Sequence, residues 1–260
     1  MLDQDHNRYH DRIAYNLRLS EPKVTKSESR AAAFRGFRDA IGVPLLLVGG
    51  GMTGFGALAH DIGFASWEAV LASVLVWALP AQVVAADLYT SGGDLVAIAI
   101  AAALASMRFF PMAVALLPTL DNSAGGQLGR IAQAQLMSAT SWAFLMRGSA
   151  PSDPRLRLAY HTVFALTCLS IGAIGTLAGY LGAAGLPRPL ALGLLFLNAA
   201  SFTVLLAETR SRQALLAVLL GAGLCAPIHM VLPEASLVLA SVIGGTVAFV
   251  FGDRLRKPAS

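Results

Sequence analysis

The sequence has little charge. Only 13% of its 260 residues are Asp, Glu, Lys or Arg, whereas 56% are hydrophobic and the mean hydropathy is +0.64. It has no GxxxxGK phosphate loop and no spacing of His, Cys and carboxylate residues that is typical of a metal site. The two cysteines, Cys168 and Cys225, both lie in apolar runs and suit small packing residues better than a disulfide. This composition excludes an ordinary soluble domain and predicts a chain that is not an enzyme and needs no cofactor.

Long apolar blocks, rather than short alternating runs, make up most of the chain and predict an all-α protein. A helix needs about 20 apolar residues to cross a bilayer. About eight segments approach this length, which predicts a polytopic transmembrane helical bundle. These segments are Ile41–Leu58, Ala69–Ala86, Leu95–Leu117, Ile131–Met146, Leu158–Leu181, Leu190–Ala207, Leu215–Leu232 and Ala235–Phe251. The fourth is the weakest because glutamine, serine and threonine dilute it.

The basic residues test this count independently, because Lys and Arg in short loops favour the cytoplasm. With both termini inside, the eight-span arrangement leaves only Arg130 and Arg188 outside and Arg108 within a span; the other basic residues are cytoplasmic. The sequence therefore predicts an inner-membrane protein with a basic cytoplasmic tail (1–38), a transmembrane transport domain (39–252) and a cytoplasmic C-terminal tail (253–260). We attribute the net charge of +4 to basic residues on the cytoplasmic side of the membrane rather than to nucleic-acid binding, since no nucleic-acid recognition motif is present.

The first 38 residues are polar and basic and do not resemble a cleavable secretory signal. Within them, Ser29–Ala40 predicts a short helix at the membrane surface, with Phe34 and Phe37 on one side and arginines nearer the headgroups. The alternative is a disordered leader.

Glycine crowds the first apolar segment directly after Pro44. Gly50, Gly51 and Gly54 belong to this run, which predicts a broken first helix whose exposed backbone groups contact a substrate. The alternative is a seam of close helix packing through Gly50 and Gly54. A similar small-residue face at Gly175 and Gly179 also permits close packing, including packing against a partner subunit.

Pro80 and Gln82 form a second irregularity, in the second segment. Proline frees a carbonyl one turn earlier, around Val76, and Gln82 brings a donor and an acceptor into an apolar setting. Both features suit a substrate or ion path. Alternatively, Gln82 bonds a neighbouring helix.

Arg108 lies near the centre of Leu95–Leu117. A guanidinium at mid-membrane opposes insertion by about 2.5 to 3.5 kcal/mol, so such residues usually face a polar cavity, a partner or a substrate. The alternative is a permanent bond to helix-end carbonyls, for instance around Gly49–Gly51. His161 and His229 lie inside or near span ends, where each can carry a proton or serve a structural role.

Two stretches, Gly56–Ala81 and Ala178–Phe202, share an order of small-residue helix end, short loop and apolar span. This order predicts two parallel four-span repeats, although generic glycine-rich membrane sequence gives a similar match.

The run from Arg35 to Gln82, with its glycine-rich first span, Glu68-Ala69 pair, Ser73 and Ala81-Gln82, resembles the opening of the AzlC/YgaZ family of branched-chain amino acid permeases. The resemblance implies the large subunit of an exporter of valine, leucine and isoleucine that works with a small AzlD/YgaH-type membrane subunit. Two departures concern the substrate. Ser106-Met107-Arg108-Phe109 keeps the arginine of the family's Asn-x-Arg-His but loses the Asn and His. Ser138-Ala139-Thr140 replaces its Thr-Asp-Glu.

These observations predict a membrane transporter of branched-chain or other aliphatic amino acids. A membrane sensor or scaffold subunit without transport of its own is the alternative, and a membrane enzyme ranks third. The substrate carboxylate is expected to pair with Arg108, and its aliphatic tail with apolar side chains such as Phe109. The predicted substrate-binding residues are Arg108, Gln82, Pro80, Gly50, Gly51, Gly54, Phe109 and Thr140.

Overall fold

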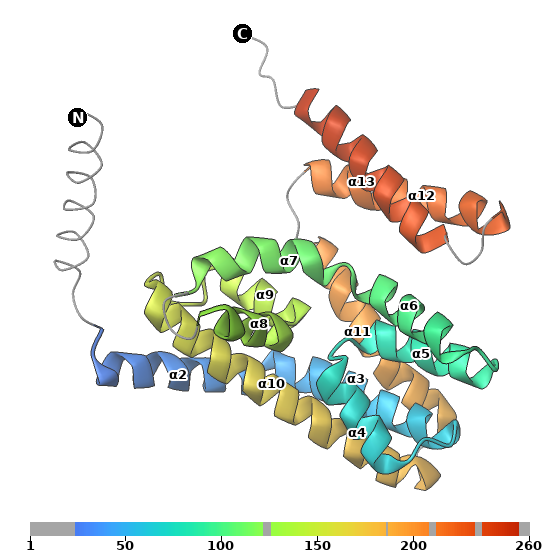
Figure 1. Ribbon diagram of the computed structural model, residues 1–260, viewed down its shortest axis with the longest axis horizontal. Coiled ribbons are helices and arrows are strands. Elements are labelled where there is room, and N and C mark those ends of the chain that lie inside the picture. The colour runs from blue at the N-terminus through green and yellow to red at the C-terminus, as the bar shows by residue number, and fades with distance from the viewer. Residues whose placement is uncertain (1–23, 122–125, 186, 208–211, 232–235, 255–260) are drawn as a thin grey trace, which may run out of the picture. The chain divides into compact units, whose positions relative to one another are not determined.

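The computed structural model describes residues 24–121, 126–185, 187–207, 212–231 and 236–254, and every regular element within these ranges is helical (Figure 1). The all-α prediction is confirmed. The α-helices are α2 (Lys26–Ile41), α3 (Val43–Asp61), α4 (Ser66–Leu75), α5 (Leu79–Thr90), α6 (Leu95–Ser106), α7 (Phe109–Leu116), α8 (Gly126–Leu136), α9 (Ala139–Met146), α10 (Pro154–Gly182), α11 (Arg188–Ala207), α12 (Arg212–Val231) and α13 (Ser236–Arg254). Two short 3₁₀ helices, η1 (Leu117–Thr119) and η2 (Ala183–Gly185), complete the set.

Two helices in the described residues are long and apolar enough to cross a membrane. They are α3 and the helical stretch Pro154–Gly185, which includes α10. A third candidate is the pair Leu95–Ser106 and Phe109–Thr119, which bends by 47° at its break. The structure therefore shows two or three candidate spans together with shorter apolar helices. The count of eight and the internal duplication stay predictions.

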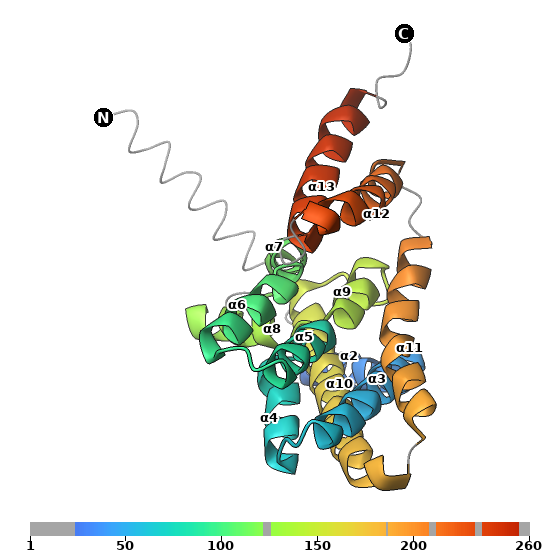
Figure 2. The ribbon, with the colours of Figure 1, turned by 90° about the vertical axis from the view of Figure 1, so that its right-hand side faces the viewer.

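The helices form two compact units, one of residues 1–42 and 111–167 and the other of residues 43–110 and 168–260. In the second unit, α3 packs closely against the later part of α10 and against α11 (Figure 2). A Cβ atom at Gly56 would overlap the carbonyl oxygen of Thr176, and one at Gly179 would overlap that of Thr53. Glycine is therefore required at both places because the two helix backbones touch.

Helix α3 is continuous from Val43 to Asp61, so the predicted break in the first helix is wrong. Its glycines serve as contact points for neighbouring helices. A Cβ atom at Gly54 would lie 2.7 Å from the backbone nitrogen of Leu195 in α11, and one at Gly50 would lie 2.9 Å from a methyl of Leu197. Tertiary contact on two sides of α3 thus holds a glycine-rich sequence in helical form.

The same contacts correct an expectation about assembly. The small-residue faces at Gly50 and Gly54 and at Gly175 and Gly179 were candidates for a partner subunit. The chain covers both faces itself. Gly54 lies against α11, and a Cβ atom at Gly175 would lie 2.8 Å from the carbonyl oxygen of Gly49.

The breaks occur in the next three predicted spans. Helices α4 and α5 are separated at Val76–Ala78, α6 and α7 at Met107–Arg108, and α8 and α9 at Met137–Ser138. The last break is capped, since Ser138 Oγ accepts a hydrogen bond from the backbone nitrogen of Ser141 at 3.1 Å. These interruptions divide apolar segments that hydropathy alone treats as single helices.

In the first unit, α2 confirms the helix predicted over Ser29–Ala40. Thr25 and Glu28 form a capping box at its start, and Glu28 accepts from the Thr25 backbone nitrogen at 2.8 Å. These hydrogen bonds lower the pKa of the Glu28 carboxyl. Phe34 and Phe37 are exposed, at 67% and 44%. Placement of α2 at the membrane surface stays a prediction, and residues 1–23 of the tail lie outside the described residues.

Helices α12 and α13 lie side by side as a hairpin in both views of the ribbon (Figures 1 and 2). They meet at glycines: a Cβ atom at Gly244 would lie 2.7 Å from the backbone nitrogen of Gly221.

Candidate functional site

The candidate site begins at the break between α4 and α5. Helix α4 ends at Leu75, with Val76 as its C-cap, and Trp77 follows with a φ of 46°, the left-handed region that a bulky residue rarely adopts. Helix α5 then starts at Leu79, and no side chain of the described residues caps it. Pro80 occupies the first turn, where its missing N–H is tolerated. The irregularity predicted around Val76 is therefore a full interruption of the helix.

Gln82 lies one turn into α5 and is almost completely buried, at 2% exposed. Neither its Nε2 nor its Oε1 atom has a hydrogen-bond partner among the described residues. The alternative that Gln82 bonds a neighbouring helix is therefore not what the structure shows. An amide buried without partners costs about 1 to 3 kcal/mol, so Gln82, next to a helix break, is a candidate for contact with a ligand.

Trp77 adds a second buried donor that sequence reasoning missed. Its side chain is 6% exposed, and its Nε1 atom has no hydrogen-bond partner in the part of the chain that the structure describes. The indole ring packs on α10, where a Cβ atom at Gly172 would lie 2.8 Å from the ring. One turn before the break, Ser73 Oγ lies 2.7 Å from Thr176 Oγ1, and both residues are fully buried. This hydroxyl pair joins α4 to α10 beside the break.

The chemistry of this break suits a small zwitterion. The uncapped start of α5 presents backbone N–H groups and the positive end of the helix dipole, which favour an anion. The Gln82 amide adds N–H donors for a carboxylate and a carbonyl oxygen that accepts from an ammonium.

Arg108 lies at the second break, between α6 and α7, and is half-buried. Its guanidinium carbon lies 5.1 Å from the centroid of the Phe109 ring, a cation–π contact that holds the charge beside an apolar surface. Helix α3 is unbroken at Gly49–Gly51, so it offers no helix-end carbonyls to Arg108 there; a permanent bond to other helix-end carbonyls stays the alternative role. Ser106 donates to the carbonyl oxygen of Ala102 at 2.8 Å at the end of α6.

The remaining predicted residues are spread over other contacts. Gly50 and Gly54 face α11, and Gly51 is buried within α3. Thr140 lies in the first turn of α9, in the other compact unit, and is half-buried. The structure supports a packing role for Gly50 and Gly54 and leaves their contact with a substrate, like that of Gly51 and Thr140, as a prediction.

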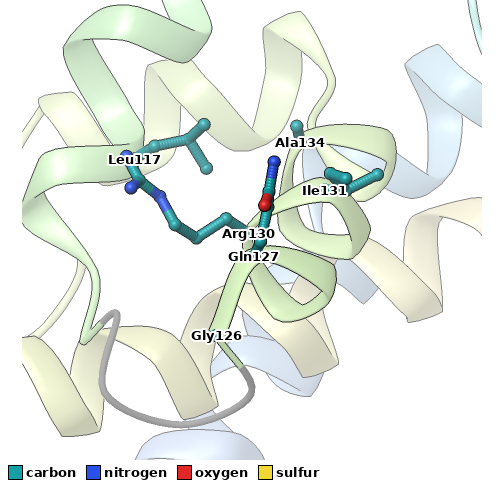
Figure 3. A pocket seen from close by; sticks show the side chains of 6 residues that line it. All are labelled: Leu117, Gly126, Gln127, Arg130, Ile131 and Ala134. Atoms are coloured by element: carbon teal, nitrogen blue, oxygen red, sulfur yellow. The ribbon is translucent and has the colours of Figure 1, made fainter.

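Among the described residues, two cavities with a charged side chain can be compared with the predicted site. One, of about 420 Å³, lies between α3 and α11 and is mostly apolar, with Asp61 at its edge. The other, of about 550 Å³, is open and lies on α8, where Arg130 and Gln127 extend their side chains (Figure 3). The first has no cationic side chain, and the second, which has Arg130 and the Gln127 amide, is lined by none of the predicted substrate-binding residues. The described residues contain no group of three or more His, Cys, Asp or Glu placed to hold a metal.

Comparison with known proteins supplies a family. No curated protein and no solved structure matches the chain. The model of the AzlC protein family matches residues 45–186, which contain most of α3, the three breaks and all of α10. This match covers more than half of the chain and confirms the resemblance seen in the sequence. The chain therefore belongs to the AzlC protein family, a family of membrane transporters associated with branched-chain amino acid transport.

Proposed function

We propose that this protein exports branched-chain or other aliphatic amino acids across the inner membrane, with both termini in the cytoplasm. The observation that carries the proposal is the buried Gln82 amide, which has no partner among the described residues and lies at the uncapped start of α5. A polar group of this kind in an apolar segment is costly unless a ligand satisfies it during the working cycle.

The second unit provides the groups for a zwitterion. The start of α5 and the Gln82 amide hold the polar end of the amino acid. The Arg108 guanidinium, with its planar fork, pairs with the carboxylate in one state of an alternating-access cycle. Pro80 fixes the turn that presents these donors, and Phe109 contributes apolar surface beside the charge. Helix breaks hold substrate in other membrane transporters for the same physical reason.

Family membership supports a partner of the small AzlD/YgaH type. Because the chain covers its own glycine faces, we place this partner elsewhere than on Gly50, Gly54, Gly175 or Gly179. Copurification from native membranes tests it: a fully active, monodisperse single-chain transporter contradicts the partner.

Counterflow tests the transport itself. Purified protein in lipid vesicles loaded with unlabelled leucine, with and without the small subunit, should accumulate labelled leucine. Gln82→Leu should abolish accumulation, whereas Gln127→Leu, which changes an exposed glutamine of α8, should not. Leucine binding without any flux would contradict the proposal and favour a sensor; equal flux in both variants would remove Gln82 from the site.

A further inference from the structure

The first compact unit contains a buried histidine that the proposed substrate site does not use. His161 of α10 is 0% exposed, and its Nδ1 atom lies 2.7 Å from Oε1 of Gln133 in α8. Gln133 Nε2 in turn donates to Thr162 Oγ1 at 3.1 Å, and Thr162 Oγ1 donates to the carbonyl oxygen of Leu158 at 2.9 Å. Three side chains thus form a directed hydrogen-bond chain between α8 and α10.

The direction of this chain determines where the imidazole proton sits. Thr162 Oγ1 lies 2.9 Å from the carbonyl oxygen of Leu158 and 3.4 Å from Gln133 Oε1, so its one hydroxyl hydrogen goes to the nearer acceptor, Leu158. Thr162 Oγ1 then accepts from the Gln133 amide nitrogen. The Gln133 amide oxygen must then face His161, and an amide oxygen only accepts. His161 Nδ1 therefore carries the hydrogen, and Nε2 has a bare lone pair.

That lone pair is buried. His161 Nε2 has no hydrogen-bond partner among the described residues. The neutral imidazole is held in one tautomer, and its basic nitrogen is enclosed in an apolar segment. Its chemistry there is to accept one proton at Nε2.

We propose that His161 is the proton-binding residue of this transporter, with Nε2 taking up one proton from water on one side of the membrane and releasing it to water on the other. The inference rests on the proposed transport function. Export against a concentration gradient needs an energy source, and a protonatable group within a membrane segment is the kind of residue that lets a proton gradient provide it. The proton enters as a hydrated ion and leaves as one, and Gln133 stays bonded to Nδ1–H throughout.

The charged groups on α10 and on the helices of the same unit influence how readily His161 takes up a proton. On α10 itself, Arg157 lies one turn earlier and donates to the carbonyl oxygen of Leu145 at 2.7 Å. On α2, Asp39 accepts from Tyr160 at 2.7 Å, and Arg35 donates to the carbonyl oxygen of Ser149. Arg130 lies one turn before Gln133 on α8, and α9 has no titratable residue. Arg157 and Arg130 oppose protonation of His161, whereas the Asp39 carboxylate favours it.

A spectroscopic measurement tests the geometry without transport. In ¹⁵N-histidine NMR of the full chain, His161→Gln assigns the resonance by its loss. We expect the Nδ1–H tautomer in the neutral ring, and uptake of a proton at Nε2 as the pH is lowered. An Nε2–H tautomer, or a ring that stays neutral at every pH at which the protein stays folded, with and without leucine, would overturn the proposal.

Transport in vesicles tests the coupling. With the membrane potential clamped and a pH dye inside, a downhill leucine gradient should drive proton movement by the wild type. His161→Gln should reduce it to the background of empty vesicles while leucine counterflow continues. His60→Gln is the matched control, since that histidine is 45% exposed beside Asp61 and should leave both signals intact. Absence of counterflow in the wild type would contradict the proposed function; counterflow with no proton movement in the wild type, or undiminished proton movement in His161→Gln, would contradict only the proton site.

Gln133→Glu provides a second variant. A carboxylate facing Nδ1–H stabilises the imidazolium, so the midpoint of proton binding should rise by about one pH unit or more. An unchanged or lowered midpoint would contradict the hydrogen-bond direction on which the proposal depends.

Discussion

Helix α10 and the α4–α5 pair are two apolar segments for which hydropathy predicts the same thing, a single continuous helix. In the structure, α10 is continuous and the α4–α5 segment is broken. Helix α10 runs unbroken from Pro154 to Gly182 behind an Asp153 cap that accepts from the Arg155 backbone nitrogen. Several of its hydroxyl side chains bond back to its own carbonyls, as Thr167 does to Val163 and Thr176 to Gly172. The α4–α5 segment breaks at Trp77 and buries Gln82 with no partner among the described residues. Several hydroxyl groups of α10 are thus satisfied within the helix itself, whereas the Gln82 amide of the broken segment has no partner among the described residues, as the proposed substrate contact requires.

The largest expected effect concerns the scaffold. Gly179→Ala should weaken the α3–α10 contact, because the new methyl overlaps the carbonyl oxygen of Thr53 and the helices must separate. We expect a loss of about 1 to 3 kcal/mol or more, measured as lower thermal stability in detergent. Gly182→Ala is the control three residues along the same helix, where nothing lies within 4 Å. Equal stability of the two variants would mean that α3 and α10 do not pack through glycine.

Arg108 gives the next largest effect, on binding. Arg108→Gln should weaken the affinity for leucine by about 10- to 100-fold, because a charge-assisted pair with the carboxylate is lost. Arg108→Lys keeps the charge but not the fork and should lie between the wild type and Arg108→Gln. Equilibrium binding measures both, with Arg130→Gln, an exposed arginine of α8, as control. Unchanged binding in a well-folded Arg108→Gln protein would rule out the carboxylate role; misfolding of both variants would favour a structural one.

Substitution of Trp77 should have a smaller effect, which raises the stability of the protein but lowers its affinity for leucine. Trp77→Phe keeps an aromatic ring against Gly172 but removes the buried Nε1–H. Loss of a buried donor without partners should raise stability by about 1 kcal/mol, while loss of a ligand contact should lower leucine affinity about fivefold. A variant that loses stability with unchanged affinity would show that the indole N–H serves the fold.

Composition was enough to predict the helical class, and resemblance was enough to predict the family, because each of these signals is spread over many residues. The position of the break was not predictable in the same way. The glycine run of α3 predicted it in the first segment, but contact with Thr176 and Leu195 keeps that helix intact. Trp77 has no sequence signal for a positive φ, since its conformation depends on the ring's contact with Gly172 far along the chain. Pro80 and Gln82 did predict an irregularity in the segment that contains the α4–α5 break, because a proline disturbs the helix within one turn of its own position.

The smallest expected effect lies outside the transport segments, at the start of α2. Hydrogen bonds from Thr25 lower the pKa of Glu28, so the folded-state pKa lies below the unfolded one. The stability that this carboxylate contributes is present above the unfolded pKa and is lost as pH falls through the folded pKa. Amide exchange should therefore show the first turn of α2 opening as the pH falls below the unfolded-state pKa of this carboxyl, and less pH dependence in Glu28→Gln, which keeps an oxygen acceptor. An equal pH dependence in both proteins would contradict the capping role of the charge.

Thermal unfolding of Gln82→Leu, with and without leucine, tests most directly whether the broken segment holds its polar groups for a substrate. Leucine should raise the Tm of the wild type by binding the folded state. The account predicts that Gln82→Leu has the same or a higher Tm without ligand, because an unsatisfied buried amide is replaced by an apolar side chain of similar size, and that leucine no longer shifts it. A lower Tm without ligand, together with a full leucine-induced shift, would contradict it.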